Sequence, residues 1–204
     1  MKEVVWKGIF PALITPFTSD DKPDLPLFEK SLEAQLAAGV HGIVLGGSLG
    51  EASTLDDHEK EILVRTAVKK IGERIPIILN IAEASTKDAL RQTQFALDWG
   101  ADGLMLLPPM RYRSDDRETV EYFKAIANAT DLPIMIYNNP VDYKIEVTLD
   151  MFEELTGCKN IGAIKESTRD VTNVSRLINR FGERYKILCG VDTLAMEELL
   201  LLLV

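Results

Sequence analysis

The chain has 204 residues, of which 46% are hydrophobic and 27% charged, a balance typical of globular proteins. Its formal net charge of −9 excludes the basic surface that binding to DNA, RNA or an anionic membrane requires. Two cysteines and two histidines are too few for a disulfide framework or a metal centre, so we expect neither. No run approaches the ~20 apolar residues that span a bilayer, and no apolar stretch follows Lys2 and Lys7, so we expect a cytoplasmic protein.

Seven short apolar runs recur along the chain. They are continuous and rich in β-branched residues, which is typical of parallel strands buried on both faces. The predicted strands are residues 9–14, 42–45, 75–81, 103–107, 132–136, 161–164 and 185–189. Amphipathic stretches between them predict helices over residues 26–38, 58–71, 86–99, 117–129, 149–155 and 171–181. Four of these stretches are followed by a glycine, the residue that most often ends a helix: Gly39, Gly72, Gly100 and Gly182.

The alternation of strand and helix predicts the fold class. Units of roughly 24–34 residues without a hairpin indicate an α/β protein with a parallel sheet, at the size of one βα unit of a TIM barrel. An open doubly wound sheet is the alternative, but its usual Gly-rich first turn is replaced here by Thr15-Pro16-Phe17. We therefore predict a single TIM (β/α)8 barrel domain over residues 1–204. Only seven units are present, so we expect the C-terminal part of the barrel to be missing from this sequence.

Lys165 is the sharpest candidate for chemistry, because it directly follows the apolar strand at residues 161–164. Active sites of such barrels lie at the carboxyl ends of the strands, and Asn80 and Thr15 also stand at such ends. A buried lysine with a lowered pKa attacks ketones and forms an imine. The alternative is a structural ion pair with Glu166 or another carboxylate at the barrel rim, and position alone does not separate the two.

Two further strand ends carry candidate residues. Tyr137 ends the preceding strand, where its phenol is either a proton shuttle for Lys165 or a core tyrosine with a satisfied hydroxyl. The Gly-rich segment 46–51 follows the second predicted strand and includes Ser48. Its backbone N–H groups, near an expected helix start, indicate a site for a carboxylate, although the segment lacks the ending of a phosphate-binding P-loop.

These motifs, in this order, resemble the dihydrodipicolinate synthase/N-acetylneuraminate lyase family of class I aldolases. The most specific are Gly-Ser-Leu-Gly-Glu at residues 47–51, Tyr-Asn-Asn-Pro at 137–140 and Ile-Lys-Glu-Ser at 164–167, and the resemblance extends from residue 8 to residue 192. It implies a homo-oligomer, tetramer or dimer, that needs no metal or organic cofactor.

The resemblance also implies a role for each matching residue. Lys165 forms an imine with pyruvate or another small 2-oxo acid, Tyr137 is the acid/base at the reacting carbon, and Ser48 relays protons. The backbone N–H groups of Ser48 and Leu49, beside Gly47, hold the substrate carboxylate. Gly190 and Asp192 match the substrate-contacting stretch after the seventh strand.

Three departures from the family pattern bear on the substrate. Leu49 replaces the usual threonine, so only its backbone serves. The tyrosine pair that such synthases carry after the fourth strand, whose second member joins the relay across a subunit interface, falls on Met110 and Arg111, with Tyr112 one place late. Asp142 stands where the synthases bear an arginine for the second substrate's carboxylate.

These departures set the order of the predicted functions. We predict an aldolase or dehydratase/deaminase acting on a 2-oxo sugar acid or related 2-oxo compound, with Arg111 or Lys144 receiving a second acidic or hydroxylated group. One alternative is a 4-hydroxy-tetrahydrodipicolinate synthase that condenses pyruvate with aspartate semialdehyde. The other is a non-catalytic barrel that binds 2-oxo acids.

Overall fold

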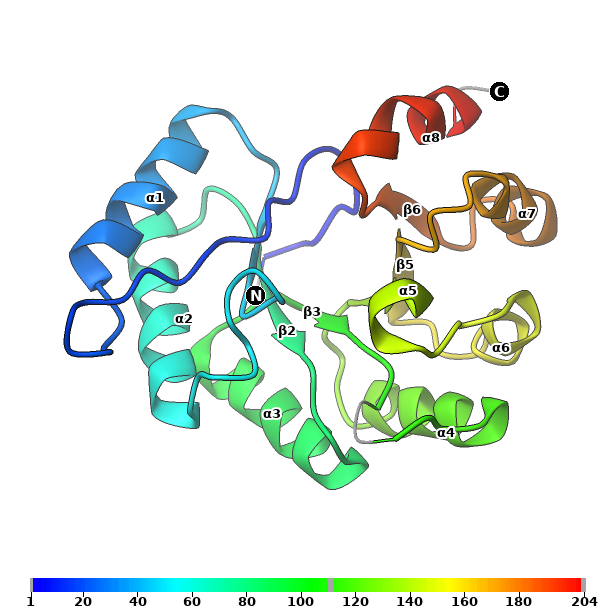
Figure 1. The fold of residues 1–204 in the computed structure, drawn as a ribbon, viewed down its shortest axis with the longest axis horizontal. Helices are drawn as coiled ribbons and strands as arrows, with labels where there is room; N and C mark the ends of the chain where they lie inside the picture. Colours follow the sequence, from blue (N-terminus) through cyan, green and yellow to red (C-terminus); the bar gives the residue numbers. More distant parts are fainter. Residues whose placement is uncertain (1, 110–111, 203–204) are drawn as a thin grey trace.

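A computed structural model describes residues 2–109 and 112–202. Within these residues one parallel sheet has the order β1-β2-β3-β4-β5-β6, so each strand pairs with the next along the chain. The strands are β1 (Ile43–Leu45), β2 (Ile77–Ile81), β3 (Gly103–Leu106), β4 (Ile134–Asn138), β5 (Ile161–Glu166) and β6 (Lys186–Cys189). The sheet curls with β1 and β6 at its edges, which is the arc of a (β/α) barrel that the sequence predicts (Figure 1).

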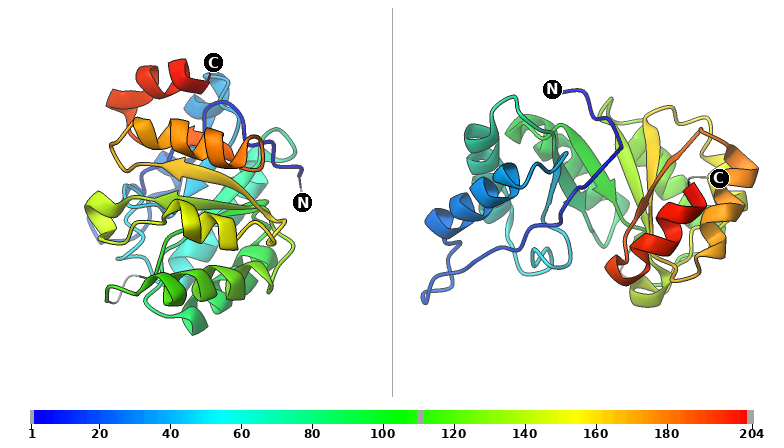
Figure 2. Two further views of the ribbon diagram at one scale, coloured as in Figure 1. Left: turned by 90° about the vertical axis from the view of Figure 1, so that its right-hand side faces the viewer. Right: turned by 90° about the horizontal axis from the view of Figure 1, so that it is seen from above.

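Helices connect the strands, and the longer ones cover the outer face of the curled sheet (Figures 1 and 2). The helices are α1 (Leu25–Ala37), α2 (Asp57–Ile71), α3 (Thr86–Trp99), α4 (Asp116–Ala127), α5 (Pro140–Tyr143), α6 (Leu149–Glu154), α7 (Thr172–Phe181), α8 (Ala195–Leu202) and the short 3-10 helix η1 (Asp192–Leu194). All six predicted helices are confirmed, and α5, α8 and η1 lie outside the six predicted ranges.

Capping side chains explain where helices begin. The Asp56 side chain accepts from the N–H of Glu59, and the Glu59 carboxylate accepts from the N–H of Asp56. Asp115 and Glu118 form the same reciprocal pair at the start of α4. Each pair satisfies backbone donors that the first helical turn leaves without a partner. The two helices therefore begin one residue earlier than hydrophobic periodicity alone predicts.

The strand predicted over residues 9–14 is not formed. This segment is extended beside β1, but its pairing is a single bridge between Ala12 and Val44. Pro11 has no N–H to donate, and Ile9 and Ile14 expose most of their side chains instead of burying them in a second layer. The segment therefore lies along the edge of the sheet without extending its ladder.

The two faces of the sheet bury separate apolar clusters. The outer face packs against the helices, and the inner face carries a smaller cluster that includes Val44, Ile78, Met105, Met135 and Ala163. Because side chains alternate along a strand, the positions two residues beyond Met135 and Ala163 share this inner face. A register irregularity after Ile134 pairs Tyr137 with Lys165 at the carboxyl ends of β4 and β5.

The N-terminal segment is tied to the opposite end of the sheet from these two residues. Trp6 joins the inner cluster, and the buried Asp102 binds both the backbone N–H and the ammonium group of Lys2, at 2.7 and 2.8 Å. Asp102 also accepts from the N–H of Ile77, the first residue of β2. The N-terminal segment thus covers the inner cluster at the amino ends of the strands. The opposite, carboxyl ends are where active sites of such barrels lie.

Candidate active site at the carboxyl ends of the strands

Lys165 lies on the inner face of β5 beside Tyr137. Its Nζ is 4.2 Å from the centroid of the Tyr137 ring, a cation–π distance for the protonated amine. Burial of the side chain lowers the pKa of Lys165 below its usual value, and the charges of Asp192 and Cys189 oppose the shift. The neutral, nucleophilic form of the amine is therefore more accessible than in an exposed lysine.

The predicted alternative, an ion pair between Lys165 and Glu166, is wrong. Glu166 is buried, and its carboxylate accepts hydrogen bonds from the N–H of Thr168 at 2.6 Å and the amide of Asn173 at 2.8 Å. Among the ion pairs within residues 2–109 and 112–202, none includes Lys165. Adjacent residues on a strand point to opposite faces, which separates the amine from the carboxylate.

Gly190, directly after β6, makes room for the lysine. Its N–H donates to the carbonyl oxygen of Glu166 at 2.8 Å, which brings the two backbones close together. A Cβ at this position would lie 2.9 Å from Cγ and Cε of Lys165 and 2.0 Å from the hydroxyl oxygen of Ser167. Glycine is thus required at this position by close approach. Asp192, two residues further on, is exposed, and its charge acts on the Lys165 amine.

Tyr137 is buried, and its hydroxyl accepts a hydrogen bond from the side-chain amide of Asn139 at 3.0 Å. The same amide also donates a hydrogen bond to the carboxylate of Asp142 at 2.7 Å. Because an amide nitrogen donates and does not accept, the proton of the Tyr137 hydroxyl is left for another partner. The hydroxyl of Tyr137 therefore has an oriented lone pair and a transferable proton, on the ring that contacts the Lys165 amine.

Two buried polar side chains hold the Gly-rich loop after β1. Asn80 donates through its side-chain amide to the carbonyl oxygen of Gly46, and Thr15 donates its hydroxyl to the carbonyl oxygen of Gly50, both at 2.8 Å. A Cβ at Gly50 would lie 2.8 Å from the carbonyl oxygen of Leu13, so a larger residue does not fit. The loop is therefore fixed at both ends, and Asn80 and Thr15 are its supports.

The expectation that this loop lies near a helix start is wrong, because α2 begins only at Asp57 and the residues between form turns. The loop nevertheless presents backbone donors. Within the described part of the chain, neither Ser48 nor Leu49 donates its N–H to another residue. Consecutive N–H groups of this kind form anion-binding concavities without a helix.

Tyr143, at the end of α5, is a site residue that the sequence pattern does not indicate. Its hydroxyl forms a hydrogen bond with the hydroxyl of Ser48. Its ring packs edge-on against Tyr137, with centroids 5.7 Å apart and an interplanar angle of 75°. A continuous set of contacts therefore leads from Ser48 through Tyr143 and Tyr137 to Lys165. The only hint in the sequence is a second tyrosine six residues after the first.

The candidate residues for a second acidic group of the substrate are less well placed. Arg111 lies outside the described residues. Lys144, in the left-handed conformation at φ 64°, donates from its ammonium group to the carbonyl oxygen of Val141. Asp142 is exposed and lies 3.9 Å from the guanidinium of Arg169, a cation that the sequence does not single out.

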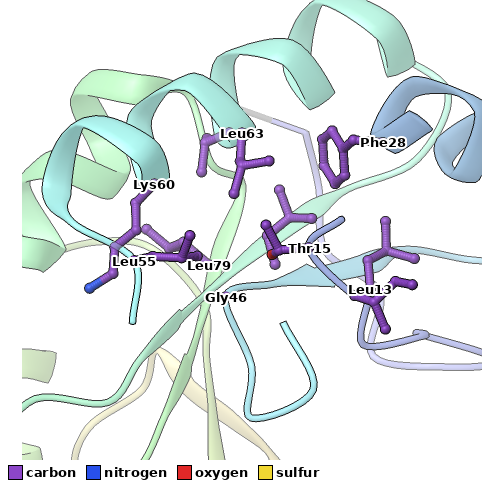
Figure 3. Close-up of a pocket in the computed structure, with 11 residues that line it drawn as sticks. Leu13, Thr15, Phe28, Gly46, Leu55, Lys60, Leu63 and Leu79 are labelled. Atoms are coloured by element: carbon purple, nitrogen blue, oxygen red, sulfur yellow. The ribbon is translucent and has the colours of Figure 1, made fainter. Parts of the chain in front are cut away.

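Figure 3 shows a cavity elsewhere in the fold, bounded by Leu13, Thr15, Phe28, Gly46, Leu55, Lys60, Leu63 and Leu79. Its volume of ≈ 10 Å³ is at the lower limit for one water molecule, so it does not hold a substrate. Residues 2–109 and 112–202 contain no group of three or more His, Cys, Asp or Glu arranged to hold a metal ion. No helix in the same ranges is long and apolar enough to cross a membrane.

The chain is similar to one family of known proteins. A model of the dihydrodipicolinate synthetase family matches residues 5–202. A 4-hydroxy-tetrahydrodipicolinate synthase from Exiguobacterium sibiricum is 37% identical over 188 residues, which are 92% of this chain and 64% of that protein. The chain spans about two thirds of the length of such relatives.

Solved structures give the same result. The dihydrodipicolinate synthase from Aquifex aeolicus matches with 33% identity and a TM-score of 0.91, over 96% of this chain and 67% of that one. A chloride-inhibited dihydrodipicolinate synthase from Acinetobacter baumannii, complexed with pyruvate, matches with 32% identity and a TM-score of 0.93, over 97% of this chain and 68% of that one.

Proposed function

This chain belongs to the dihydrodipicolinate synthetase family, and we propose that it is a class I, Schiff-base-forming lyase acting on pyruvate or a related 2-oxo acid. The observation that carries the proposal is the position of the Lys165 amine, which is partly buried against the ring of Tyr137 and paired with no described carboxylate. The neutral amine attacks the ketone carbon, and the resulting carbinolamine takes up one proton and loses water to give an iminium ion. That ion accepts electrons from a bond breaking at the neighbouring carbon.

The other proposed roles follow from the surroundings of Lys165. Tyr137 transfers the proton at the reacting carbon, for which its hydroxyl proton is available. The N–H groups of Ser48 and Leu49, beside Gly47, bind the substrate carboxylate. Gly190 and Asp192 form the opposite wall, where Asp192 also acts electrostatically on the amine.

Borohydride reduction in the presence of pyruvate tests this proposal, because it converts an imine into a stable secondary amine. We expect a pyruvate adduct on the wild-type protein and none on Lys165→Ala. A panel of larger 2-oxo acids extends the test to the substrate. If no member of the panel gives an adduct, the lyase function is contradicted and a non-catalytic barrel that binds 2-oxo acids is favoured.

The second candidate function is 4-hydroxy-tetrahydrodipicolinate synthase, which is favoured by the names of the relatives at 32–37% identity. The exposed Asp142 argues against it, because it stands where a carboxylate of the second substrate needs a cation. Loss of a charge-assisted partner costs about 1.5–3 kcal/mol of binding, and an aspartate adds repulsion. Turnover of pyruvate with aspartate semialdehyde, compared with cleavage or dehydration of 2-oxo-3-deoxy sugar acids, separates the two.

We also propose that the reaction needs no metal or organic cofactor, because the covalent imine supplies the electron sink. The proposed assembly is a homo-oligomer, dimer or tetramer, in the cytoplasm, with small 2-oxo acids as partners. Activity in the presence of a metal chelator and the mass of the assembly in solution test these points. The described residues are proposed to be part of a single barrel domain.

A further inference from the structure

The segment between β4 and α6, which contains α5, fixes the position of the Tyr143 side chain. The buried amide of Asn138 accepts from the N–H of Val147 at 2.9 Å and donates to its carbonyl oxygen at 3.1 Å, which closes the loop at its base. Asn139 caps α5 by accepting from the N–H of Asp142 at 3.2 Å. Two consecutive amides of the Tyr-Asn-Asn-Pro motif therefore fix the short helix at whose end Tyr143 stands.

Tyr143 also connects the buried Tyr137 to the hydroxyl of Ser48. Its phenol is half-buried, and burial raises the pKa of Tyr143, while the hydrogen bond to Ser48 opposes the shift. Ser48 itself is exposed on the Gly-rich loop. The hydrogen-bonded pair thus has one member against the ring of Tyr137 and the other in contact with water.

We propose that Ser48 and Tyr143 of the same chain form the proton relay between Tyr137 and solvent during reaction at the carbon next to the Lys165 imine. This inference rests on the proposed imine chemistry and deepens it. Both members of the proposed relay come from one subunit, with the ring of Tyr143 against that of Tyr137, whereas the family resemblance predicts a tyrosine supplied across a subunit interface. Tyr143 acts through Ser48 and Tyr137 and is a positioning and relay residue.

The proton balance can be written for pyruvate. The C3–H bond of the iminium breaks, and its electrons form the C2–C3 double bond of the enamine while the nitrogen loses its positive charge. The proton goes to the oxygen of Tyr137, whose own proton passes to the Ser48–Tyr143 pair. The pair releases one proton to water beside Ser48, and reversal of these steps returns a solvent proton to C3.

Exchange of the pyruvate methyl protons in deuterium oxide, followed by proton NMR, measures this relay without a second substrate. We expect Tyr143→Phe to trap pyruvate with borohydride as the wild type does but to exchange about 10-fold or more slowly, since proton shuttles contribute at least that much. Ser48→Ala is expected to do the same, and the double variant to be no slower than the slower single variant. Tyr112→Phe, at an exposed tyrosine of the loop after β3, is the matched control for a relay supplied from that loop.

The outcomes separate the two proposals. If the wild type traps no pyruvate, the proposed function fails on this substrate and the relay fails with it. If trapping is normal and Tyr143→Phe exchanges at the wild-type rate, only the relay is wrong. If trapping and exchange fall together in Tyr143→Phe, the tyrosine is merely structural and the relay is again wrong. Should Tyr143→Phe fold poorly by circular dichroism, Ser48→Ala, at an exposed loop position, gives the deciding comparison.

Discussion

The amine of Lys165 lies over the ring of Tyr137, 4.2 Å from its centroid, and the two residues are register partners on neighbouring strands. Parallel strands bring their carboxyl ends to the same edge of the sheet, so the pairing of β4 with β5 fixes this contact. The same arrangement partly shields the amine from water and sets the ring of Tyr137 beside the amine that is proposed to form the imine.

The pH dependence of imine formation follows from the shielding of Lys165. Because burial lowers the pKa of Lys165, its neutral fraction at a given pH exceeds that of an exposed lysine with a pKa of 10.5. We expect the rate of borohydride-trappable adduct formation, at limiting pyruvate, to rise with pH and level off below pH 10.5. A rate that continues to rise through pH 10.5 contradicts the lowered pKa.

Gly190→Ala is expected to disturb the lysine directly, because the new Cβ would lie 2.9 Å from Cγ and Cε of Lys165. Overpacking of this kind costs about 1–3 kcal/mol of folding free energy, and the displaced amine should trap pyruvate far more slowly. Gly157→Ala is the matched control, since no atom lies within 4 Å of its Cβ position. Denaturant unfolding and trapping rates are the measurements, and equal behaviour of the two variants would refute the packing role.

Tyr137→Phe is expected to retain imine formation and to slow methyl exchange of pyruvate by about 10²–10⁴-fold, because the phenol is the proposed acid/base. Tyr185→Phe removes another buried hydroxyl, which donates to the carbonyl oxygen of Phe152 at 2.8 Å, and serves as control. It should cost about 1 kcal/mol of stability without slowing exchange. A wild-type exchange rate in Tyr137→Phe would remove the acid/base role.

Asp102→Ala is expected to destabilise the fold by about 2–4 kcal/mol, because it leaves the N–H of Ile77 and the ammonium group of Lys2 without their buried acceptor. Asp131→Ala, at an exposed aspartate, is the control and should change stability by less than about 0.5 kcal/mol. Chemical denaturation measures both. Because Asp102 lies at the far end of the sheet, pyruvate trapping by the folded variant should be unchanged.

The sequence predicts the fold and the common position of Lys165 and Tyr137 at the strand ends well, for a shared physical reason. Buried parallel strands read as continuous apolar runs, and the first polar residue after each run stands at the catalytic edge of the sheet. Lys165 and Tyr137 are such residues. The segment at residues 9–14 has the same apolar character, but Pro11 and an edge position prevent a ladder, which hydrophobicity alone does not reveal.

Tyr143 and Arg169 could not be predicted in the same way. Both lie beyond the end of a strand, Tyr143 at the end of α5 and Arg169 in the segment after β5, and their positions depend on side-chain contacts between separate segments. For Tyr143 these are the Asn138–Val147 closure and the hydroxyl of Ser48 on another loop. Such contacts join residues far apart in sequence and leave no periodic pattern. The predicted ion pair between Lys165 and Glu166 is wrong for a similar reason. The actual partners of Glu166, Thr168 and Asn173, are recognised only in three dimensions.

The identity of the reactive amine is the most direct test of the account. After borohydride reduction with pyruvate, proteolysis and mass mapping should locate the adduct on the peptide that contains Lys165 and leave Lys144, the exposed lysine directly after α5, unmodified. An adduct on Lys144 or any other lysine, or one that persists at full yield in Lys165→Ala, would contradict the assignment of Lys165 as the nucleophile.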